Sequence, residues 1–561
     1  MKRLATHWAF LPLLLALALR LTAIWWGLPA SDGWDNDGIA PRDVFPGLVA
    51  SFTPGEFYTY PPLHLAVLAV LSSPVAIWGA LASPSLHVGD VVTTLLAPSY
   101  MTWFAAIARV VALVLSLATT WLVADLARRT CGPRAATIAA WAGAVNMGFT
   151  YYGKTSNLDV PCIFYATLSI WFLTRDRLVP NGRHKIYAAL AAVCAVTTKD
   201  QAYANFVLVL PVCAFASLVE RSSAPRWQRV RAWALALAAG VGGYAVASTL
   251  LFNPRGFFAR LAFLRGSASQ DFMLYSDDWS GRLAAAEGTL RSLQNLLGAP
   301  LLALAAVGVL AVCLQRVVAK RRVARMLPGL AALSFFVFFN CVARRSEERF
   351  VLAQSTFLAF YVGVGLAYLD TLLRGQLATP VRFLAPLFLL PALVRSLALD
   401  AGLLNDPRHE VERWLAEHHG AKIEAYGNDV YLPRFEAGAN VVRISPPESP
   451  IQSPLPGVRD VVAAFGDVGE RQPDFLIVPH AYSWRYRTRV DPAEHGRVMA
   501  RGVARAAESS DGGQFFKALF EEELGYRKIL QAECDDSIFE RINLHASVCE
   551  PVLVFARIAA P

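Results

Sequence analysis

The sequence predicts a polytopic α-helical membrane protein with a C-terminal soluble α/β domain. Of its 561 residues, 55% are hydrophobic and only 17% are charged, whereas about one quarter of the residues of soluble domains are charged. Residues 1–400 hold 34 basic and 19 acidic side chains, and residues 401–561 hold 18 and 24. Since the basic excess lies in the hydrophobic part, it indicates membrane orientation, and no nucleic-acid partner is expected.

Apolar stretches recur along residues 1–400, and the longer ones suffice to cross a bilayer as helices. We expect eleven crossings, near residues 8–28, 109–126, 135–150, 160–174, 186–198, 202–219, 232–252, 294–315, 327–342, 350–368 and 383–399. The loops between them alternate between Arg/Lys-rich and acidic. The positive-inside rule therefore places the N-terminus in the cytoplasm and the C-terminal domain outside the plasma (inner) membrane.

Two further apolar stretches, 62–81 and 91–108, lie within the predicted first outer loop, residues 29–108. They must contribute zero or two crossings for the charge alternation to hold. We expect zero, with juxtamembrane or re-entrant helices, and a total of thirteen crossings is the alternative. A second long outer loop is expected at 253–293, which completes a transmembrane domain of residues 1–400.

Residues 401–561 are predicted to form one extracytoplasmic α/β domain, because hydropathy drops there and short strand-like runs begin. Examples of such runs are 475–478 and 552–555. Cys534 and Cys549 share this domain, so a disulfide between them is permitted and is as plausible as two free thiols.

Ionisable residues on the outer membrane face are not explained by orientation. Three short outer turns and the start of one crossing carry these basic residues: Lys154, Lys199, Arg344, Arg345, Arg349 and Arg109. Charges at this depth are costly and usually face cavities or partners. Together they would form a cationic pocket for a phosphate or pyrophosphate. In the alternative, each base only neutralises a neighbouring acid at a helix end.

The first outer loop supplies negative charge in the run Asp32-Gly33-Trp34-Asp35-Asn36-Asp37-Gly38. A carboxylate beside a phosphate pocket can remove the proton from an incoming hydroxyl or amine. The Asp-Asn-Asp triplet also suits a divalent cation. We expect no cofactor, and a metal at Asp35 and Asp37 is the less favoured alternative.

Short motifs follow one another in a characteristic order on the predicted outer side. They are Asp35 or Asp37-Gly38, Tyr60-Pro61-Pro62-Leu63, Asn157-Leu158-Asp159, Thr198-Lys199-Asp200, Arg349-Phe350-Val351-Leu352, and Asp406-Pro407-Arg408 with Trp414. The set resembles the polyprenyl-phosphate-dependent GT-C glycosyltransferases of family 39, the branch of protein O-mannosyltransferases and lipid A aminoarabinose transferases. Gly38 stands where that family usually has Glu, and Tyr60 where it has His or Lys.

The resemblance implies inverting transfer of a hexose or pentose from a polyprenyl phosphate in the membrane lipid to an envelope glycolipid, polysaccharide or protein. It implies Asp37 as general base, Asp35 as the second choice, and Asp159 in orienting the acceptor or the base. Lys199, Arg344, Arg345 and Arg349 would hold the donor phosphate, with Lys154 and Arg109 as further candidates.

A non-catalytic transporter or binding protein for lipid-linked sugars is the alternative function, since it would use the same cationic pocket without a base. A solute transporter would show inverted repeats, which the sequence lacks.

Overall fold

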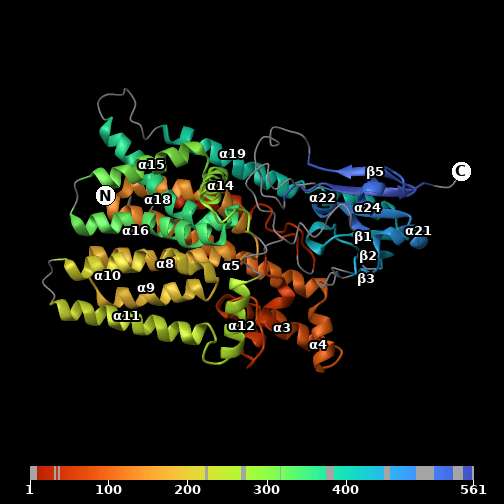
Figure 1. The fold of residues 1–561 in the computed structure, drawn as a ribbon, viewed down its shortest axis with the longest axis horizontal. Helices are drawn as coiled ribbons and strands as arrows, with labels where there is room; N and C mark the ends of the chain where they lie inside the picture. The colour runs from red at the N-terminus through yellow and green to blue at the C-terminus, as the bar shows by residue number, and fades with distance from the viewer. Residues whose placement is uncertain are drawn as a thin grey trace. The chain divides into compact units, whose positions relative to one another are not determined.

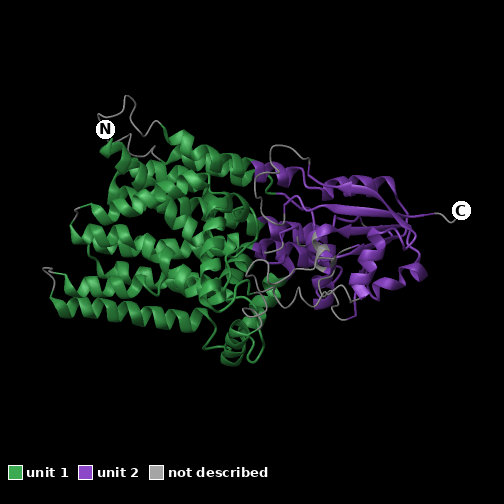
Figure 2. Cartoon of the chain, turned by 45° about the horizontal axis from the view of Figure 1, so that its top comes forward, with its two compact units in different colours: residues 1–24, 43–71, 107–397 green, residues 25–42, 72–106, 398–561 purple. Residues whose placement is uncertain are grey.

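The computed structural model describes residues 9–30, 33–35, 38–220, 225–266, 273–315, 318–373, 384–436, 438–447, 455, 457–487, 511–534 and 548–558. The chain divides into two compact units, which Figure 2 colours separately. Unit 1 comprises Met1–Ile24, Asp43–Leu71 and Ile107–Leu397, and unit 2 comprises Trp25–Arg42, Ser72–Ala106 and Ala398–Pro561. The predicted first outer loop is therefore shared between the units.

The membrane part consists of helices. They are α1 (Phe10–Leu21), α2 (Val44–Phe52), α3 (Pro62–Ala82), α4 (Val88–Leu95), α5 (Pro98–Cys131), α6 (Pro133–Ala144), α7 (Met147–Tyr152), α8 (Asp159–Leu178), α9 (Gly182–Val196), α10 (Val209–Val219), α11 (Arg226–Ala247), α12 (Pro254–Arg265), α14 (Trp279–Leu297), α15 (Ala299–Leu314), α16 (Ala319–Phe335), α17 (Cys341–Ala343), α18 (Glu348–Leu372) and α19 (Ala385–Leu404).

Helix α18 lies at the centre of unit 1, where it packs against α6, α14, α15 and α16. Within its apolar stretch 89% of the residues are buried, against 6% for α11. Helices α8, α9 and α11 lie side by side, with α11 beyond α9 (Figure 1). Helices α18 and α11 are both apolar, so the exposed helix α11 presents a surface suited to lipid.

Seven helical segments in the described part of the chain are long and apolar enough to cross a membrane, or eight if the bent pair α14 and α15 forms one span. The pair bends by 110° at Gly298, whose φ of +79° favours glycine. The structure thus confirms a polytopic helical protein. The predicted outer loop 253–293 contains α12 and most of α14, and the predicted crossing 135–150 is divided between α6 and α7.

The apolar segment 91–108 is not a separate element, because α5 begins at Pro98 and continues unbroken to Cys131. A helix of 34 residues is about 51 Å long at about 1.5 Å per residue, well beyond the roughly 30 Å of a bilayer core. Helix α3 meets the length and apolarity criteria for a span. The expectation that 62–81 does not cross therefore stays a prediction.

Unit 2 contains the predicted α/β domain. Its strands are β1 (Ile423–Tyr426), β2 (Val441–Ser445), β3 (Arg459–Val462), β4 (Phe475–Pro479), β5 (Tyr526–Ala532) and β6 (Val552–Arg557). They form one sheet in the order β3-β2-β1-β4-β6-β5. The first four pair in parallel, and β6 is antiparallel to both β4 and β5. The two strand-like runs of the sequence are thus neighbours, β4 and β6.

Helices α20 (Arg408–Glu417), α21 (Val468–Arg471), α22 (His480–Arg487) and α24 (Asp511–Phe520) accompany the sheet. Strands β1 and β2 are buried along their whole length, whereas β3 at the edge is largely exposed. Buried side chains gather in two separate clusters, one of which includes Phe516 and the other Val411. A sheet covered on both faces explains why β4 and residues 552–555 of β6 are continuous apolar runs. Cys534 and Cys549 form a disulfide between β5 and β6.

Candidate active site

Two of the predicted site residues, Asp159 and Lys199, form an ion pair. Asp159 opens α8 and is 1% exposed, and its two carboxylate oxygens accept from Lys199 Nζ at 2.7 and 2.8 Å. Gln201 Nε2 also donates to Asp159 Oδ1, at 2.9 Å. An acid in the first turn is favoured by the helix dipole. Asp159 therefore fixes the position of the Lys199 ammonium.

Three predicted phosphate-binding cations surround the ring of Phe350. The ring centroid lies 5.9 Å from Lys199 Nζ, 4.6 Å from Arg345 Cζ and 4.7 Å from Arg349 Cζ. Phe350 is buried at 6% exposure, and cations at these distances are attracted to an aromatic face. We call these four residues the Phe350 cluster. The sequence analysis assigned no role to Phe350; an aromatic residue directly after a basic run was the available signal.

The two arginines of the Phe350 cluster share one carboxylate. Arg345 Nη2 lies 2.9 Å from one Glu347 oxygen, and Arg349 Nη2 lies 3.1 Å from the other. Burial would raise the pKa of the Glu347 carboxyl, but the guanidiniums of Arg349 and Arg345 outweigh it and lower the pKa below its usual range. The side chains of Lys199, Arg345 and Arg349 are 22%, 11% and 23% exposed, so the cluster combines fixed geometry with access.

A buried amide holds the turn that carries these arginines. Asn340 donates to the carbonyl oxygen of Arg345 at 2.9 Å and accepts from Gln354 Nε2 at 2.6 Å. It ends a π-helical turn, Phe336–Asn340, a distortion often found at functional sites. Arg344 adopts a left-handed backbone conformation with φ +53°. Its role as a phosphate ligand stays a prediction.

Arg260 connects the Thr-Lys turn with the Tyr-Pro-Pro-Leu segment. It is 2% exposed, donates through Nε to the carbonyl oxygen of Thr59 at 3.0 Å, and forms an ion pair with Asp200. The amide of Leu63 also donates to the carbonyl oxygen of Thr197, at 3.1 Å. The Thr-Lys turn and the Tyr-Pro-Pro-Leu segment are therefore linked by hydrogen bonds and an ion pair beside Lys199.

Lys154 and Arg109 contact a different element. Lys154 Nζ donates to the carbonyl oxygens of Leu19 and Thr22 at 2.8 and 2.6 Å, and Arg109 Nη1 donates to that of Ile24 at 2.6 Å. Both side chains are 2% exposed. Cations are favoured at the C-terminal end of a helix, so this pair stabilises the end of α1.

Arg20 was not predicted as a site residue, although it is a lone cation inside the first expected crossing. It is fully buried and donates to Ser116 Oγ at 3.2 Å, to Thr120 Oγ1 at 3.1 Å and to the carbonyl oxygen of Gly143 at 2.8 Å. These contacts link α1 to α5 and α6 and identify Arg20 as a structural residue.

Asp35 belongs to unit 2, whereas the Phe350 cluster belongs to unit 1. Asp35 is buried at 6% exposure. Asp37 lies outside the described residues, so its role as base stays a prediction, as does a metal at Asp35 and Asp37. Among the residues that the structure describes, no group of three or more His, Cys, Asp or Glu side chains could hold a metal ion.

Residues 90–244 match the family described as dolichyl-phosphate-mannose-protein mannosyltransferase. No curated protein sequence matches the chain. Among solved structures, ArnT from Cupriavidus metallidurans in the apo state is 15% identical, with 88% of this chain and 97% of that chain covered and a TM-score of 0.49.

The oligosaccharyltransferase of Archaeoglobus fulgidus, tethered to an acceptor peptide, is 12% identical. That similarity covers 76% of this chain and 62% of the other, with a TM-score of 0.42. The mycobacterial arabinofuranosyltransferase AftD is 14% identical over 100% of this chain and 40% of its own, with a TM-score of 0.34. The match over residues 90–244 confirms the resemblance inferred from the motifs: the chain is a polytopic membrane protein similar to the GT-C glycosyltransferases of the protein O-mannosyltransferase branch.

Proposed function

We propose that the protein transfers a sugar from a polyprenyl-phosphate donor to an envelope acceptor at the outer membrane face. The observation that carries this proposal is the Phe350 cluster, in which cations from two turns surround one ring. Cleavage of the bond between sugar and phosphate leaves negative charge on the phosphate oxygens. Preorganised cations stabilise that charge most strongly in the transition state.

The ion pairs around the cluster suit it to this task. Three cations share two carboxylates, since Asp159 holds Lys199 and Glu347 holds both arginines. An arginine offers two parallel donors to phosphate oxygens, which gives orientation as well as affinity. Arg344 would add a fourth cation from the same turn.

We assign the general base to Asp37, with Asp35 as the second choice. The carboxylate would take the proton from the acceptor hydroxyl or amine while that group attacks the anomeric carbon. The polyprenyl phosphate leaves unprotonated from the opposite side of the sugar, so the configuration inverts. Lys154 and Arg109 have an architectural role in this proposal, because their buried donors hold the end of α1.

The disulfide between Cys534 and Cys549 supports the proposed sidedness. Disulfides persist in oxidising compartments and are rare in the cytoplasm. A C-terminal domain outside the membrane agrees with the charge alternation of the loops, which puts the N-terminus in the cytoplasm.

The test uses the full-length protein in nanodiscs, with undecaprenyl phosphate as the binding probe. We expect Arg349→Ala to weaken probe binding about 10- to 100-fold, the range for loss of one charge-assisted hydrogen bond. Arg291→Ala is the matched control, because Arg291 pairs with Glu287 on the surface at 65% exposure. Unchanged binding in Arg349→Ala would contradict the proposed phosphate site.

A second measurement separates an enzyme from a binding protein. Asp37→Asn should abolish sugar transfer and leave undecaprenyl phosphate binding within about twofold. Mass spectrometry of envelope glycans from a deletion strain and its parent would identify the product for the assay. If Asp37→Asn and Asp35→Asn both transfer sugar at the wild-type rate, the assigned base is wrong. Probe binding without any transfer by the wild type would favour the binding or transport alternative.

A further inference from the structure

The segment that carries Asp35 is packed within the same compact unit as the C-terminal sheet domain. Residues Trp25–Arg42 and Ala398–Pro561 both belong to unit 2. Two tryptophans of the segment, Trp26 and Trp34, are 4% and 2% exposed. Indole rings of this size rarely become so buried without specific partners.

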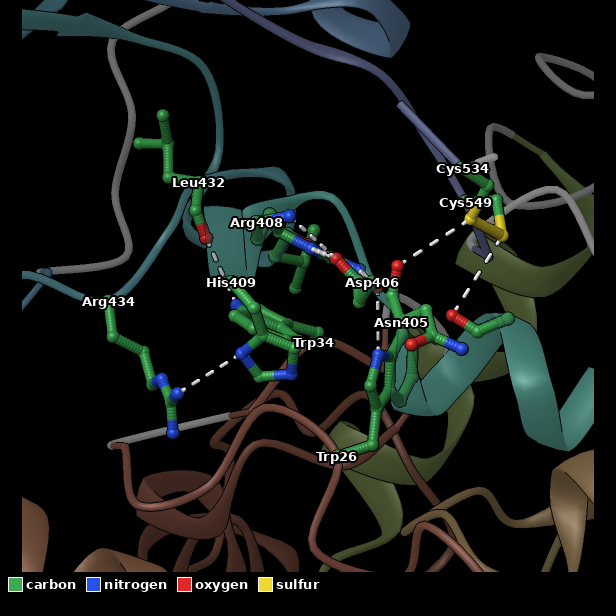
Figure 3. A network of polar contacts seen from close by, with 12 residues as sticks. Trp26, Trp34, Asn405, Asp406, Arg408, His409, Leu432, Arg434, Cys534 and Cys549 are labelled. Carbon is green, nitrogen blue, oxygen red and sulfur yellow. Dashed lines mark hydrogen bonds and ion pairs between the residues drawn. A yellow bond between two sulfur atoms is a disulfide. The ribbon is translucent and has the colours of Figure 1, made fainter. Parts of the chain in front are cut away.

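Arg408 contacts both rings, which also contact each other edge to face at 6.1 Å (Figure 3). Its Cζ lies 4.2 Å from the Trp34 centroid and 5.3 Å from the Trp26 centroid. Its Nε and Nη2 donate to the two oxygens of Asp406 at 2.7 and 2.6 Å, and its Nη1 donates to the carbonyl oxygen of Val430. Trp26 Nε1 donates to Asp406 Oδ2 at 2.9 Å, across 380 positions of sequence.

A second arginine, Arg434, also contacts Trp34. Arg434 Cζ lies 5.3 Å from the Trp34 centroid, and its Nη1 donates to the carbonyl oxygen of Leu28 at 2.6 Å. Arg434 also pairs with Glu412 of α20, at 2.6 Å. Trp34 Nε1 donates to the carbonyl oxygen of Leu432 at 3.0 Å. Trp34 thus contacts two guanidiniums, each paired with a carboxylate.

The disulfide lies against the residues that precede Asp406. The sulfurs of Cys534 and Cys549 are 3.7 and 3.8 Å from the carbonyl oxygens of Asn405 and Gly402 (Figure 3). The covalent link between β5 and β6 therefore packs on the chain that presents Asp406 and Arg408.

We infer that Asp406, Arg408 and Arg434 form a lock that holds Trp26 and Trp34 on the C-terminal domain and thereby positions Asp35, the second choice for the base. The inference rests on the proposed function for its catalytic consequence. Asp35 directly follows Trp34, so its Cα is about 3.8 Å from that of the locked residue. A displacement of about 1 Å in a reacting group can lower a rate about 100-fold. Arg408 and Trp34 are positioning residues in this scheme.

The experiment compares Trp34→Ala with the wild type in the full-length protein in nanodiscs. Hydrogen exchange of peptides covering residues 25–35 should speed up at least about tenfold, while peptides of β1, β4 and β6 keep their protection. The kcat for transfer should fall about 100-fold, with the donor KM and undecaprenyl phosphate binding within about twofold. Trp34→Phe keeps an aromatic ring in contact with the guanidiniums and should recover part of kcat.

Arg413→Ala is the matched control, because Arg413 is an exposed arginine of helix α20, the helix that begins at Arg408. It should change neither exchange nor kcat. Unchanged exchange at 25–35 in Trp34→Ala, or a loss of protection that includes the β strands, overturns the lock. Faster exchange with normal kcat overturns its positioning role and leaves the proposed function intact. If the wild type transfers no sugar, the proposed function fails, while the exchange data still decide whether the lock exists.

Discussion

The Phe350 cluster and the lock of Asp406, Arg408 and Arg434 are built from the same residue types, yet their arginines differ in burial. The Arg408 side chain is 2% exposed and that of its partner Asp406 is 0% exposed. Arg345 and Arg349 share Glu347 and are 11% and 23% exposed. In both places guanidinium Cζ atoms lie 4.2–4.7 Å from the centroid of an aromatic ring.

The difference shows how one set of residue types serves two purposes. A buried arginine whose nitrogens all donate within the protein fixes the position of its neighbours and has little capacity for a ligand. A partly exposed pair presents its guanidiniums to solvent at a defined place. Burial therefore distinguishes a structural cation cluster from a candidate phosphate site, even where ring contacts look alike.

The largest expected effect is on stability. Arg408→Ala would leave Asp406 buried without its guanidinium, at a cost of about 3–5 kcal/mol in the free energy of unfolding of the C-terminal unit. Denaturant unfolding followed by fluorescence would measure it, with Arg557→Ala as control because that residue's pair with Asp474 is 41% and 44% exposed. A loss below about 1 kcal/mol would show that the lock is not a buried ion pair in solution.

Arginine-to-lysine changes should sharpen the contrast. Lysine keeps the charge and loses the planar fork, so Arg349→Lys should retain undecaprenyl phosphate binding within about tenfold. Arg408→Lys should lose about 2 kcal/mol of stability, because one ammonium cannot reproduce the paired hydrogen bonds to Asp406. Equal losses of stability in Arg349→Lys and Arg408→Lys would contradict the proposed distinction between a phosphate site and a structural lock.

The smallest effect concerns pH. Because the folded-state pKa of Glu347 is lowered, its contribution to stability is present above its ordinary pKa of about 4.3 and is lost as pH falls through the lower folded-state value. Thermal unfolding measured across acidic pH should show this slope in the wild type and a shallower one in Glu347→Gln. Identical slopes in the two proteins would mean that the arginines do not hold Glu347 ionised.

Several features of the candidate site followed from the sequence because their signals are local. A base beside an acid at the end of an apolar run marked two turns, that of Lys199 and that of Arg345 and Arg349. The two turns meet at Phe350. Lys154 and Arg109 carried the same local signal, yet they donate to carbonyl oxygens at the end of α1 and just after it. Only packing decides whether a cation contacts backbone carbonyl oxygens or joins a cluster of other cations.

Hydropathy and charge alternation by themselves determined the membrane class, the approximate helices and the presence of a separate α/β domain, because each depends on runs of neighbouring residues. Tertiary structure alone decided that α5 is unbroken, that Gly298 bends the chain and that Cys534 pairs with Cys549. It also decided that Trp34 meets Arg408. The disulfide and the contact of Trp34 with Arg408 join residues that are not neighbours in the chain, and such contacts form only when buried area and hydrogen bonds outweigh the entropy of bringing the residues together.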